Sequence, residues 1–279
     1  MSMEKVKIEK NTVQETLIIP LYGRKMCSEK FPNLYQDVFA KKLCEKLDYD
    51  FSELEKKKNT FLYEFGALEA AMRQLGMVWE IKNYLDKFPN ATIVNLGCGL
   101  DETGKTCDNG LCKIINIDFL EVISIRNRLI CPNEREVNIS CDLKNYSWMD
   151  KVDGSNGVIF FAAGVFHYFK KEEVKSLMLE LSKRYTKGCL VFDAVGKLGL
   201  KLMMKTALKN MDIKDVEGYF YVNNPLKDLN WSKKIKISSK GYMLGYYDMK
   251  SSGIHFLHRL LASICDKVLK MSINRIDFE

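Results

Sequence analysis

Residues 91–118 read ATIVNLGCGLDETGKTCDNGLCKIINID, and this stretch decides the fold. An apolar run enters a turn at Gly97-Cys98-Gly99, and a second apolar run ends at an acid, Asp118, nineteen residues past Gly99. Glycines after a first strand let the backbone approach a ligand closely, and an acid that ends the second strand can accept from both ribose hydroxyls. The pattern therefore predicts a site for a nucleoside cofactor.

The third glycine of the dinucleotide fingerprint is absent from this turn. Glu102 stands where the GxGxxG pattern requires a small residue that packs helix on strand. This difference favours S-adenosylmethionine over NAD as the cofactor.

Composition and charge fit one compact catalytic unit. The chain has 279 residues, is 47% hydrophobic and carries a net charge of +7, with lysines mostly interleaved with acids, which indicates a solvated surface rather than a nucleic-acid footprint. The nine cysteines include no CxxC pair and are interpreted as reduced thiols. No leader pattern opens the chain, and no apolar segment approaches the roughly 18 residues of a membrane span. We therefore expect a cytoplasmic protein without a metal, membrane or nucleic-acid partner; the sequence leaves its oligomeric state open.

Hydrophobic periodicity divides the chain near residue 90. From Phe61 to Trp79 the apolar positions step by four and three, which predicts a long amphipathic helix that the KFPNAT segment ends. We expect residues 1–89 to form an N-terminal helical cap segment and residues 90–279 to form the core, both within one integrated domain.

Strand-like runs alternate with helical runs after residue 90. Strands are expected at 91–97, 112–118, 135–142, 157–163 and 189–195, with helices at about 119–130 and 171–185. The tail predicts a strand at 241–249, a helix at about 254–270 and a closing strand at 273–278. Alternation of this kind predicts an α/β fold with a parallel sheet and helices on both faces.

Several segments, taken in order, carry a family resemblance. They are LIIPLYGRKMCSEKFPNLYQD, AAMRQ, VNLGCGLDETG, NIDFLEVISIRNRLI, CDL and FFAAGVFHYFKKEEVKSLM. Together they resemble the leucine carboxyl methyltransferase-like family, which includes bacterial polyketide carboxyl O-methyltransferases. The resemblance implies a class I S-adenosylmethionine-dependent methyltransferase, in which a helical cap covers a Rossmann-like seven-stranded sheet. The closing INRIDFE would be the antiparallel last strand of that sheet.

The resemblance also implies which residues contact the cofactor. Arg73 would pair with the methionyl carboxylate, for which a guanidinium fork is well suited. Gly97 and Gly99 would contact the methionyl part through their backbone, and Asp118 the ribose. A solvated helix arginine is the alternative for Arg73.

Four further positions are assigned to this cofactor site. Asp142 and Leu143 would contact the adenine, although Asp142 could instead cap the following helix. Lys41 resembles a family lysine near the cofactor carboxylate, with a plain surface lysine as the alternative. Ala163 stands where many family members carry an acid in the sequence AEGV, and Gln74 replaces a common threonine.

The residues needed near the methyl acceptor depend on whether the reaction requires a base. His167 lies beyond the carboxyl end of the fourth strand, where a base could serve a hydroxyl acceptor, but its aromatic neighbours could equally hold it as packing. Tyr168 resembles a family tyrosine near the transfer site, and Tyr22 and Arg24 are candidates to line the acceptor pocket.

These observations predict an S-adenosylmethionine-dependent O-methyltransferase that acts on a small organic molecule, most readily at a carboxylate. A carboxylate is already ionised at neutral pH and needs only orientation. Two alternatives stay open. The first is methylation of a protein C-terminal carboxylate, and the second is a non-catalytic S-adenosylmethionine-binding protein.

Overall fold

A seven-stranded sheet forms the centre of the computed structural model, which describes residues 5–9, 12–210 and 218–279. In chain order its strands are Thr92–Leu96 (β3), Lys113–Asp118 (β4), Glu136–Ser140 (β5), Val158–Ala162 (β6), Gly188–Ala194 (β7), Ile235–Gly241 (β8) and Ser272–Phe278 (β9). They lie in the order β5-β4-β3-β6-β7-β9-β8, and β9 is antiparallel to both of its neighbours. Two short strands, Val6–Lys7 (β1) and Leu47–Asp48 (β2), pair separately.

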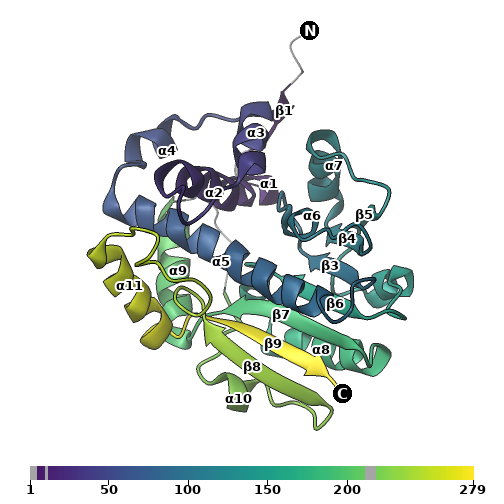
Figure 1. The fold of residues 1–279 in the computed structure, drawn as a ribbon. Coiled ribbons are helices and arrows are strands. Elements are labelled where there is room, and N and C mark those ends of the chain that lie inside the picture. Colours follow the sequence, from purple (N-terminus) through teal and green to yellow (C-terminus); the bar gives the residue numbers. More distant parts are fainter. Residues whose placement is uncertain (1–4, 10–11, 211–217) are drawn as a thin grey trace.

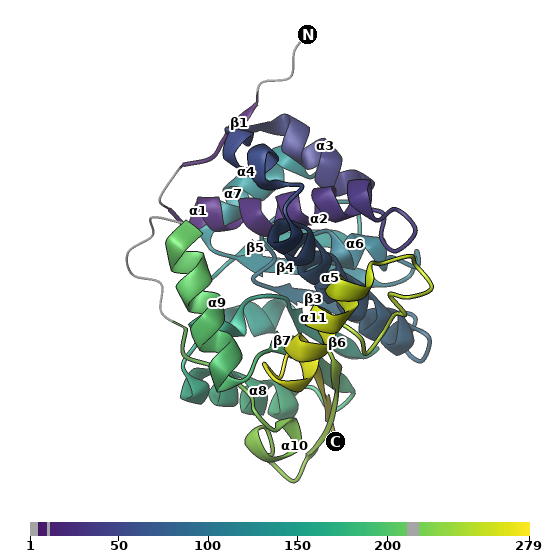
Figure 2. The same cartoon turned by 90° about the vertical axis from the view of Figure 1, so that its left-hand side faces the viewer.

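Helices surround this sheet and cover one of its ends (Figure 1). In chain order they are Val13–Thr16 (α1), Ile18–Lys30 (α2), Val38–Lys46 (α3), Ser52–Lys57 (α4), Phe61–Leu85 (α5), Thr103–Thr106 (α6), Leu120–Leu129 (α7), Lys171–Arg184 (α8), Lys197–Asn210 (α9), Pro225–Asp228 (α10) and Phe256–Lys267 (α11). Short 3₁₀ turns occupy Tyr146–Lys151 and Phe166–Tyr168. We call α1–α4 the cap. Figure 2 shows α9 and α11 on the same side of the molecule.

The two faces of the sheet pack against different helices, because side chains along a strand alternate between its faces. In β6, Phe161 belongs to the cluster that contains Met72 of α5, whereas Phe160 belongs to the cluster that contains Leu177 of α8. The first cluster also includes Met26 of the cap. The cap and the sheet therefore share one hydrophobic core across the boundary expected near residue 89.

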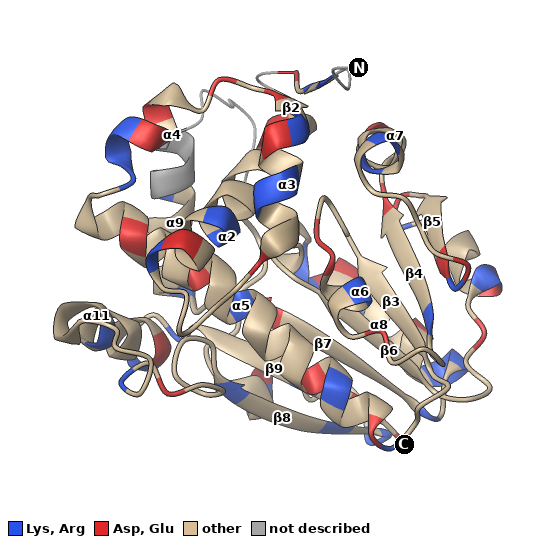
Figure 3. Cartoon of the chain, turned by 45° about the horizontal axis from the view of Figure 1, so that its top comes forward, with Lys and Arg blue, Asp and Glu red and all other residues tan. Residues whose placement is uncertain are grey.

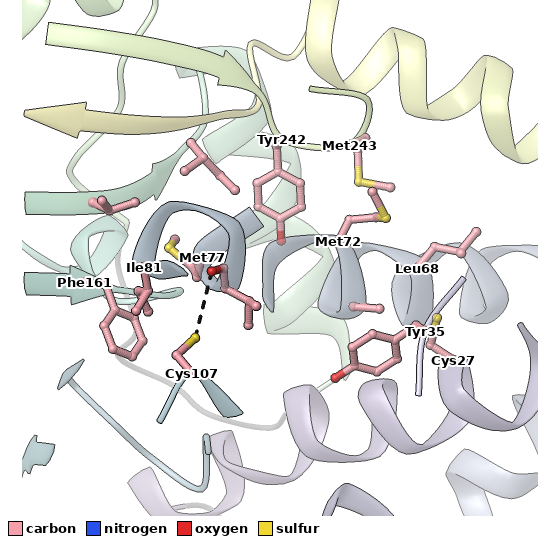
Figure 4. Packing of buried hydrophobic residues seen from close by; sticks show 14 of the residues in the cluster. Cys27, Tyr35, Leu68, Met72, Met77, Ile81, Cys107, Phe161, Tyr242 and Met243 are labelled. Atoms are coloured by element: carbon pink, nitrogen blue, oxygen red, sulfur yellow. Dashed lines mark hydrogen bonds between the residues drawn. The ribbon is translucent and has the colours of Figure 1, made fainter. Parts of the chain in front are cut away.

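α5 is buried on more sides than a single amphipathic stripe predicts. Leu68 and Met72 of the expected stripe are fully buried, but Met77 and Ile81 are also fully buried. Figure 4 shows Met77 and Ile81 beside Phe161, with Leu68 and Met72 toward other parts of the core. The helix lies between the cap, the sheet and the C-terminal segments, so apolar side chains are buried on more than one of its sides.

Most expected elements are confirmed, and one is wrong. The five strands, both intervening helices, the long helix and the antiparallel closing strand lie within a few residues of their expected positions. The strand expected at 241–249 is absent, because β8 ends at Gly241 and residues 242–249 are irregular. In this segment Gly245 donates to the carbonyl of Gly241 in a tight turn, while Tyr242 and Met243 are buried in irregular backbone. Aromatic content favours strands, but glycines at this spacing allow the turn.

Charged residues of both signs lie next to one another on the surface. On α4, Glu53 and Glu55 precede Lys56 and Lys57, and Figure 3 shows this mixture of signs. Within the described residues, the helices are too short or too polar to cross a lipid bilayer. The same residues contain no group of three or more His, Cys, Asp or Glu side chains placed to hold a metal ion.

Candidate active site

The loop after β3 has a shape that requires glycine. Gly97 and Gly99 have φ angles of 70° and 48°, in the left-handed region that other residues rarely adopt. The amides of Gly97 and Cys98 donate to the carbonyl of Ile117 in β4 at 2.8 and 3.0 Å. A Cβ on Gly97 would lie 2.6 Å from Val165 Cγ2. The loop is therefore held between the end of β4 and the turn that follows β6.

Asp118 ends β4 and faces this loop. Its Oδ2 accepts from the Gly99 amide at 2.8 Å, and its Oδ1 accepts from the Phe119 amide at 2.8 Å. Burial raises the pKa of the Asp118 carboxyl, and the two amide donors act in the opposite direction. Each carboxylate oxygen has a second lone pair with which to accept from a ligand.

A cavity of about 470 Å³ lies above the loop, within the size range of small-molecule and cofactor sites. It lies at the carboxyl ends of β3–β6, where ligands bind in open α/β sheets. Cap residues Leu17, Pro20 and Leu21 contribute to its wall. The sequence-predicted residues that line it are Arg24, Arg73, Gly97, Gly99, Asp118, Asp142, Leu143, Ala163 and Tyr168.

Three residues assigned to the site from sequence lie outside the cavity lining formed by the described residues. Lys41 is exposed on α3. Tyr22 is buried, donates to Glu55 Oε1 at 2.8 Å and stacks on the ring of Phe51. His167 is also buried, with 5% exposure. These three side chains therefore lie away from the described lining, because packing holds two of them inside and Lys41 faces solvent, and their contact with a ligand stays a prediction.

The environment of His167 favours its neutral form. Burial lowers the pKa of the imidazole, Arg73 lowers it further, and Asp193 opposes both effects. Nε2 of His167 lies 3.8 Å from Asp193 Oδ2. The aromatic packing that the sequence left as an alternative is present, since the ring lies edge-on to Tyr168.

Arg73 reaches the cavity from α5. Its side chain is 19% exposed, and its Nη1 lies 3.7 Å from Asp193 Oδ2. Burial alone would lower the pKa of the guanidinium, but Tyr242 and Asp193 raise it above the ordinary value, so Arg73 stays a cation. Gly164, with φ of 75°, lies against this cation, and a Cβ there would be 2.5 Å from Nη1.

Arg24 lines the cavity but is bound to the chain itself. Its Nε lies 3.1 Å from Asp37 Oδ2, Nη1 donates to Asp101 Oδ1 at 3.2 Å, and Nη2 donates to the Leu100 carbonyl at 3.2 Å. Gln74 of α5 also donates to Asp101 Oδ1, at 3.0 Å. Arg24 thus joins the cap to the loop after β3, and its contact with an acceptor stays a prediction.

Asp142 occupies the cavity lining and also caps a local turn. Its Oδ1 accepts from the amide of Lys144 at 2.9 Å. The N-cap of the following 3₁₀ helix is Asn145 and not Asp142, so the helix-capping alternative for Asp142 is wrong, and its side chain holds only the turn before that helix.

Sequence reasoning missed three residues that support this site: Asp101, Arg126 and Asp193. Arg126 of α7 is 1% exposed and donates to the carbonyls of Gly99 and Asp101 at 3.1 and 2.7 Å, so it holds the glycine loop from behind. Asp193 directly follows the apolar run CLVF. An acid at the carboxyl end of a predicted strand could have indicated a residue near the site. Nothing in the sequence pattern distinguishes Arg126 from a surface helix arginine.

Comparison with known proteins identifies the family. The model of the leucine carboxyl methyltransferase family matches residues 19–182, which is more than half of the chain. The tetracenomycin polyketide synthesis O-methyltransferase TcmP of Streptomyces glaucescens is 26% identical over 184 residues. That alignment spans 66% of this chain and 66% of the relative.

Solved structures share the fold at low sequence identity. A DUF574 family protein from Streptomyces avermitilis superposes with a TM-score of 0.62 at 8% identity, covering 92% of this chain and 97% of that one. The plantazolicin methyltransferase BpumL, solved in complex with a triazolic desmethylPZN analog and S-adenosylhomocysteine, superposes with a TM-score of 0.51 at 15% identity, covering 96% of this chain and 100% of that one. Together with the family match, this similarity shows that the chain belongs to the leucine carboxyl methyltransferase family of S-adenosylmethionine-dependent methyltransferases.

Proposed function

We propose that this protein is an O-methyltransferase that transfers the methyl group of S-adenosylmethionine to a carboxylate of a small organic molecule. The observation that carries the proposal is the single cavity in which the glycine loop, Asp118, Asp142 and Arg73 meet. Their donor and acceptor groups match a nucleoside joined to an amino acid. The cofactor, when bound, supplies an activated methyl group on a sulfonium.

Each end of the cavity suits one part of this cofactor. Asp118 would accept from the ribose hydroxyls, and Asp142 from the exocyclic amine of adenine, with Leu143 against its ring. Arg73 would donate to the methionyl carboxylate, where a bidentate guanidinium pair is stronger than a neutral hydrogen bond. Ala163 and Gly164 would lie beside the methionyl chain, since both line the cavity near Arg73.

The remaining wall favours an acceptor with an apolar body. Leu17, Pro20 and Leu21 of the cap line it, together with Ala70 of α5. Tyr168 also lines it, and burial raises the pKa of its phenol, so the hydroxyl keeps its proton at neutral pH. Tyr168 can therefore donate a hydrogen bond that orients an anionic acceptor oxygen.

The charge state of the cavity supports a carboxylate acceptor. A hydroxyl acceptor gains from a base whose pKa lies near the working pH. His167 is the nearby side chain of that type, and it lies outside the described lining, close to Asp193. A carboxylate arrives ionised and needs only in-line positioning toward the sulfonium methyl. TcmP, the O-methyltransferase relative, supports an oxygen acceptor.

The acceptor assignment is tested by the stability of the methylated product to alkali. The protein is incubated with methyl-labelled S-adenosylmethionine and paired acceptors, each an aromatic or aliphatic acid and its corresponding alcohol. We expect label in acid-derived products that release volatile methanol in mild base, as methyl esters do. Label held in base-stable ethers would overturn the carboxylate assignment. Transfer to the C terminus of a protein but to no small acid would favour the protein-carboxylate alternative, and cofactor binding without any transfer would favour a non-catalytic protein.

We further propose that the enzyme works in the cytoplasm on a diffusible substrate. All nine cysteines are free thiols, and seven of them are buried, which suits a reducing compartment. Cell fractionation that places the protein in the membrane or secreted fraction would contradict this.

A further inference from the structure

The Arg73 guanidinium lies near a buried carboxylate, that of Asp193. Asp193 comes from the end of β7 and its side chain is 4% exposed. Within the described residues, it supplies the carboxylate that lies within 4.0 Å of the Arg73 guanidinium. Asp193 itself is absent from the described lining, so its influence on a ligand would pass through Arg73.

The second oxygen of Asp193 holds the neighbouring loop. Oδ1 accepts from the Gly164 amide at 2.6 Å, and Oδ2 faces Arg73 Nη1 at 3.7 Å and His167 Nε2 at 3.8 Å. Gly164 leaves the space in which the guanidinium lies, because any Cβ there would be 2.5 Å from Nη1. One carboxylate thus fixes both the cation and the backbone against which the cation rests.

The position of Asp193 coincides with the departure from the family pattern. β6 and β7 pair with Ala162 opposite Phe192, so Ala163 and Asp193 are the next residues along two adjacent strands. Ala163 stands where the family resemblance led us to expect an acid. Asp193 places a carboxylate at the adjoining strand end.

We propose that Asp193 is a positioning residue that orients Arg73 toward the methionyl carboxylate of the cofactor. This rests on the proposed cofactor. With Asp193 neutralising one side of the guanidinium and restricting its rotation, the remaining N–H donors are held toward the cavity. A preorganised donor loses less conformational freedom when the ligand binds.

The test compares two ligands that differ only at the amino-acid end. S-adenosylhomocysteine carries the methionyl-type carboxylate and amine, whereas 5′-methylthioadenosine keeps the adenosyl thioether without either group. Dissociation constants are measured by calorimetry for wild type, Asp193→Asn and Arg73→Lys. The control is Asp153→Asn, an acid outside the cavity lining that pairs with Lys113 at the surface.

We expect Asp193→Asn to weaken S-adenosylhomocysteine binding about tenfold or more and to change 5′-methylthioadenosine binding less than twofold. Arg73→Lys should show the same selectivity, and the double variant should lose little beyond Arg73→Lys alone, because both residues act on one contact. If Asp193→Asn does not fold, Asp193→Glu, which keeps the charge at a shifted position, should show the same selective loss to a smaller degree.

Other outcomes would overturn the inference. Equal weakening of both ligands would make Asp193 a general structural residue, and unchanged or tighter S-adenosylhomocysteine binding would show that it does not orient Arg73. In both cases the proposed function would stand, because wild type still binds the cofactor product. Failure of wild type to bind S-adenosylhomocysteine would overturn the proposed function and this inference together.

Discussion

Asp118 already accepts two backbone hydrogen bonds before a ligand arrives, so its orientation is set by the fold. We expect Asp118→Ala to weaken S-adenosylhomocysteine binding by about 2 kcal/mol, the scale of hydrogen bonds to a charged group. Calorimetry on this variant and on the control Asp153→Ala measures the effect. An unchanged dissociation constant for Asp118→Ala would place this carboxylate outside the ribose site.

Glu69 is a titratable group that the proposed reaction does not use. It lies one helical turn before Arg73 on α5, and burial raises the pKa of its carboxyl to about 7, although Arg73 lowers it. The folded state therefore binds a proton that the unfolded state releases above pH 4.5, and the free energy of unfolding falls as pH rises from about 4.5 to 7.

Replacing Glu69 with glutamine, which has a similar shape but no charge, should remove the loss of unfolding free energy at high pH. We expect Glu69→Gln to stabilise the protein by about 2 kcal/mol at pH 8 and to have little effect at pH 4.5, where the acid is protonated in the folded state and half protonated in the unfolded state. The expected stabilisation is smaller than the free energy that corresponds to the whole pKa shift of Glu69, because this side chain is partly exposed and solvent screens its charge. Denaturant unfolding at both pH values measures it. A gain of the same size at pH 4.5 would show that charge is not the cause.

At the scale of the elements, two turns contain a glycine with a positive φ angle. Substituting each glycine tests whether its missing side chain matters for ligand binding or only for the backbone conformation. Gly164 and Gly110 have φ of 75° and 81°, but a Cβ would meet Arg73 only at Gly164, with open space at Gly110. Both alanine variants should lose about 1 kcal/mol of stability from backbone strain. Only Gly164→Ala should also displace the guanidinium and weaken S-adenosylhomocysteine binding.

Thermal unfolding and calorimetry on the two variants separate these effects. Equal S-adenosylhomocysteine affinity in Gly164→Ala and Gly110→Ala would mean that the Arg73 guanidinium can accommodate a methyl group at position 164. That result would contradict the prediction from the short Cβ–Nη1 distance. A loss of affinity in Gly110→Ala would show that strain alone, rather than the contact with Arg73, accounts for weaker binding.

The elements also show what the sequence can and cannot predict. β3, β6 and β7 are buried along their whole length, and β4 is buried between its exposed first residue Lys113 and its partly buried last residue Asp118. All four read as short apolar runs, so periodicity and length locate them. β8 alternates partly buried isoleucines with polar residues at the sheet edge, and its signal was weaker than that of the aromatic segment after it. That segment is buried through tertiary packing, which local propensity does not contain.

For the whole molecule, spacing in the sequence predicted the site residues that lie in one continuous stretch. It did not predict those that are brought together from distant parts of the chain. Gly97, Gly99 and Asp118 follow from spacing in one continuous stretch. Asp193 is separated from Arg73 by 120 positions in the chain, and only the packing of α5 against the end of β7 brings the two side chains together. The burial of His167 likewise comes from packing against other segments, which periodicity around the residue did not reveal.

Arg24 lines the cavity and makes a buried polar connection between the cap and the core. Its guanidinium is 9% exposed and bridges Asp37 of the cap to Asp101 after β3. Removing one partner of a buried ion pair leaves an uncompensated charge and costs about 3 kcal/mol or more. We therefore expect Arg24→Gln to lower the free energy of unfolding by about 3 kcal/mol and to loosen the cap over the cavity.

The loss should propagate to ligand binding, because the cavity wall consists of residues from both parts. Arg24→Gln should bind S-adenosylhomocysteine more weakly, and the ligand-induced rise in melting temperature should shrink with it, since stabilisation by a ligand follows its affinity. Arg184→Gln is the matched control, because Arg184 forms its ion pairs with Asp150 and Glu180 at the surface. If Arg24→Gln loses stability but keeps wild-type affinity and the full ligand-induced shift, the cap does not depend on this connection to close the cavity. The apolar clusters that join the cap to the core, one around Met26 and Met72 and one around Leu21 and Leu100, would then hold the two parts together without this ion pair.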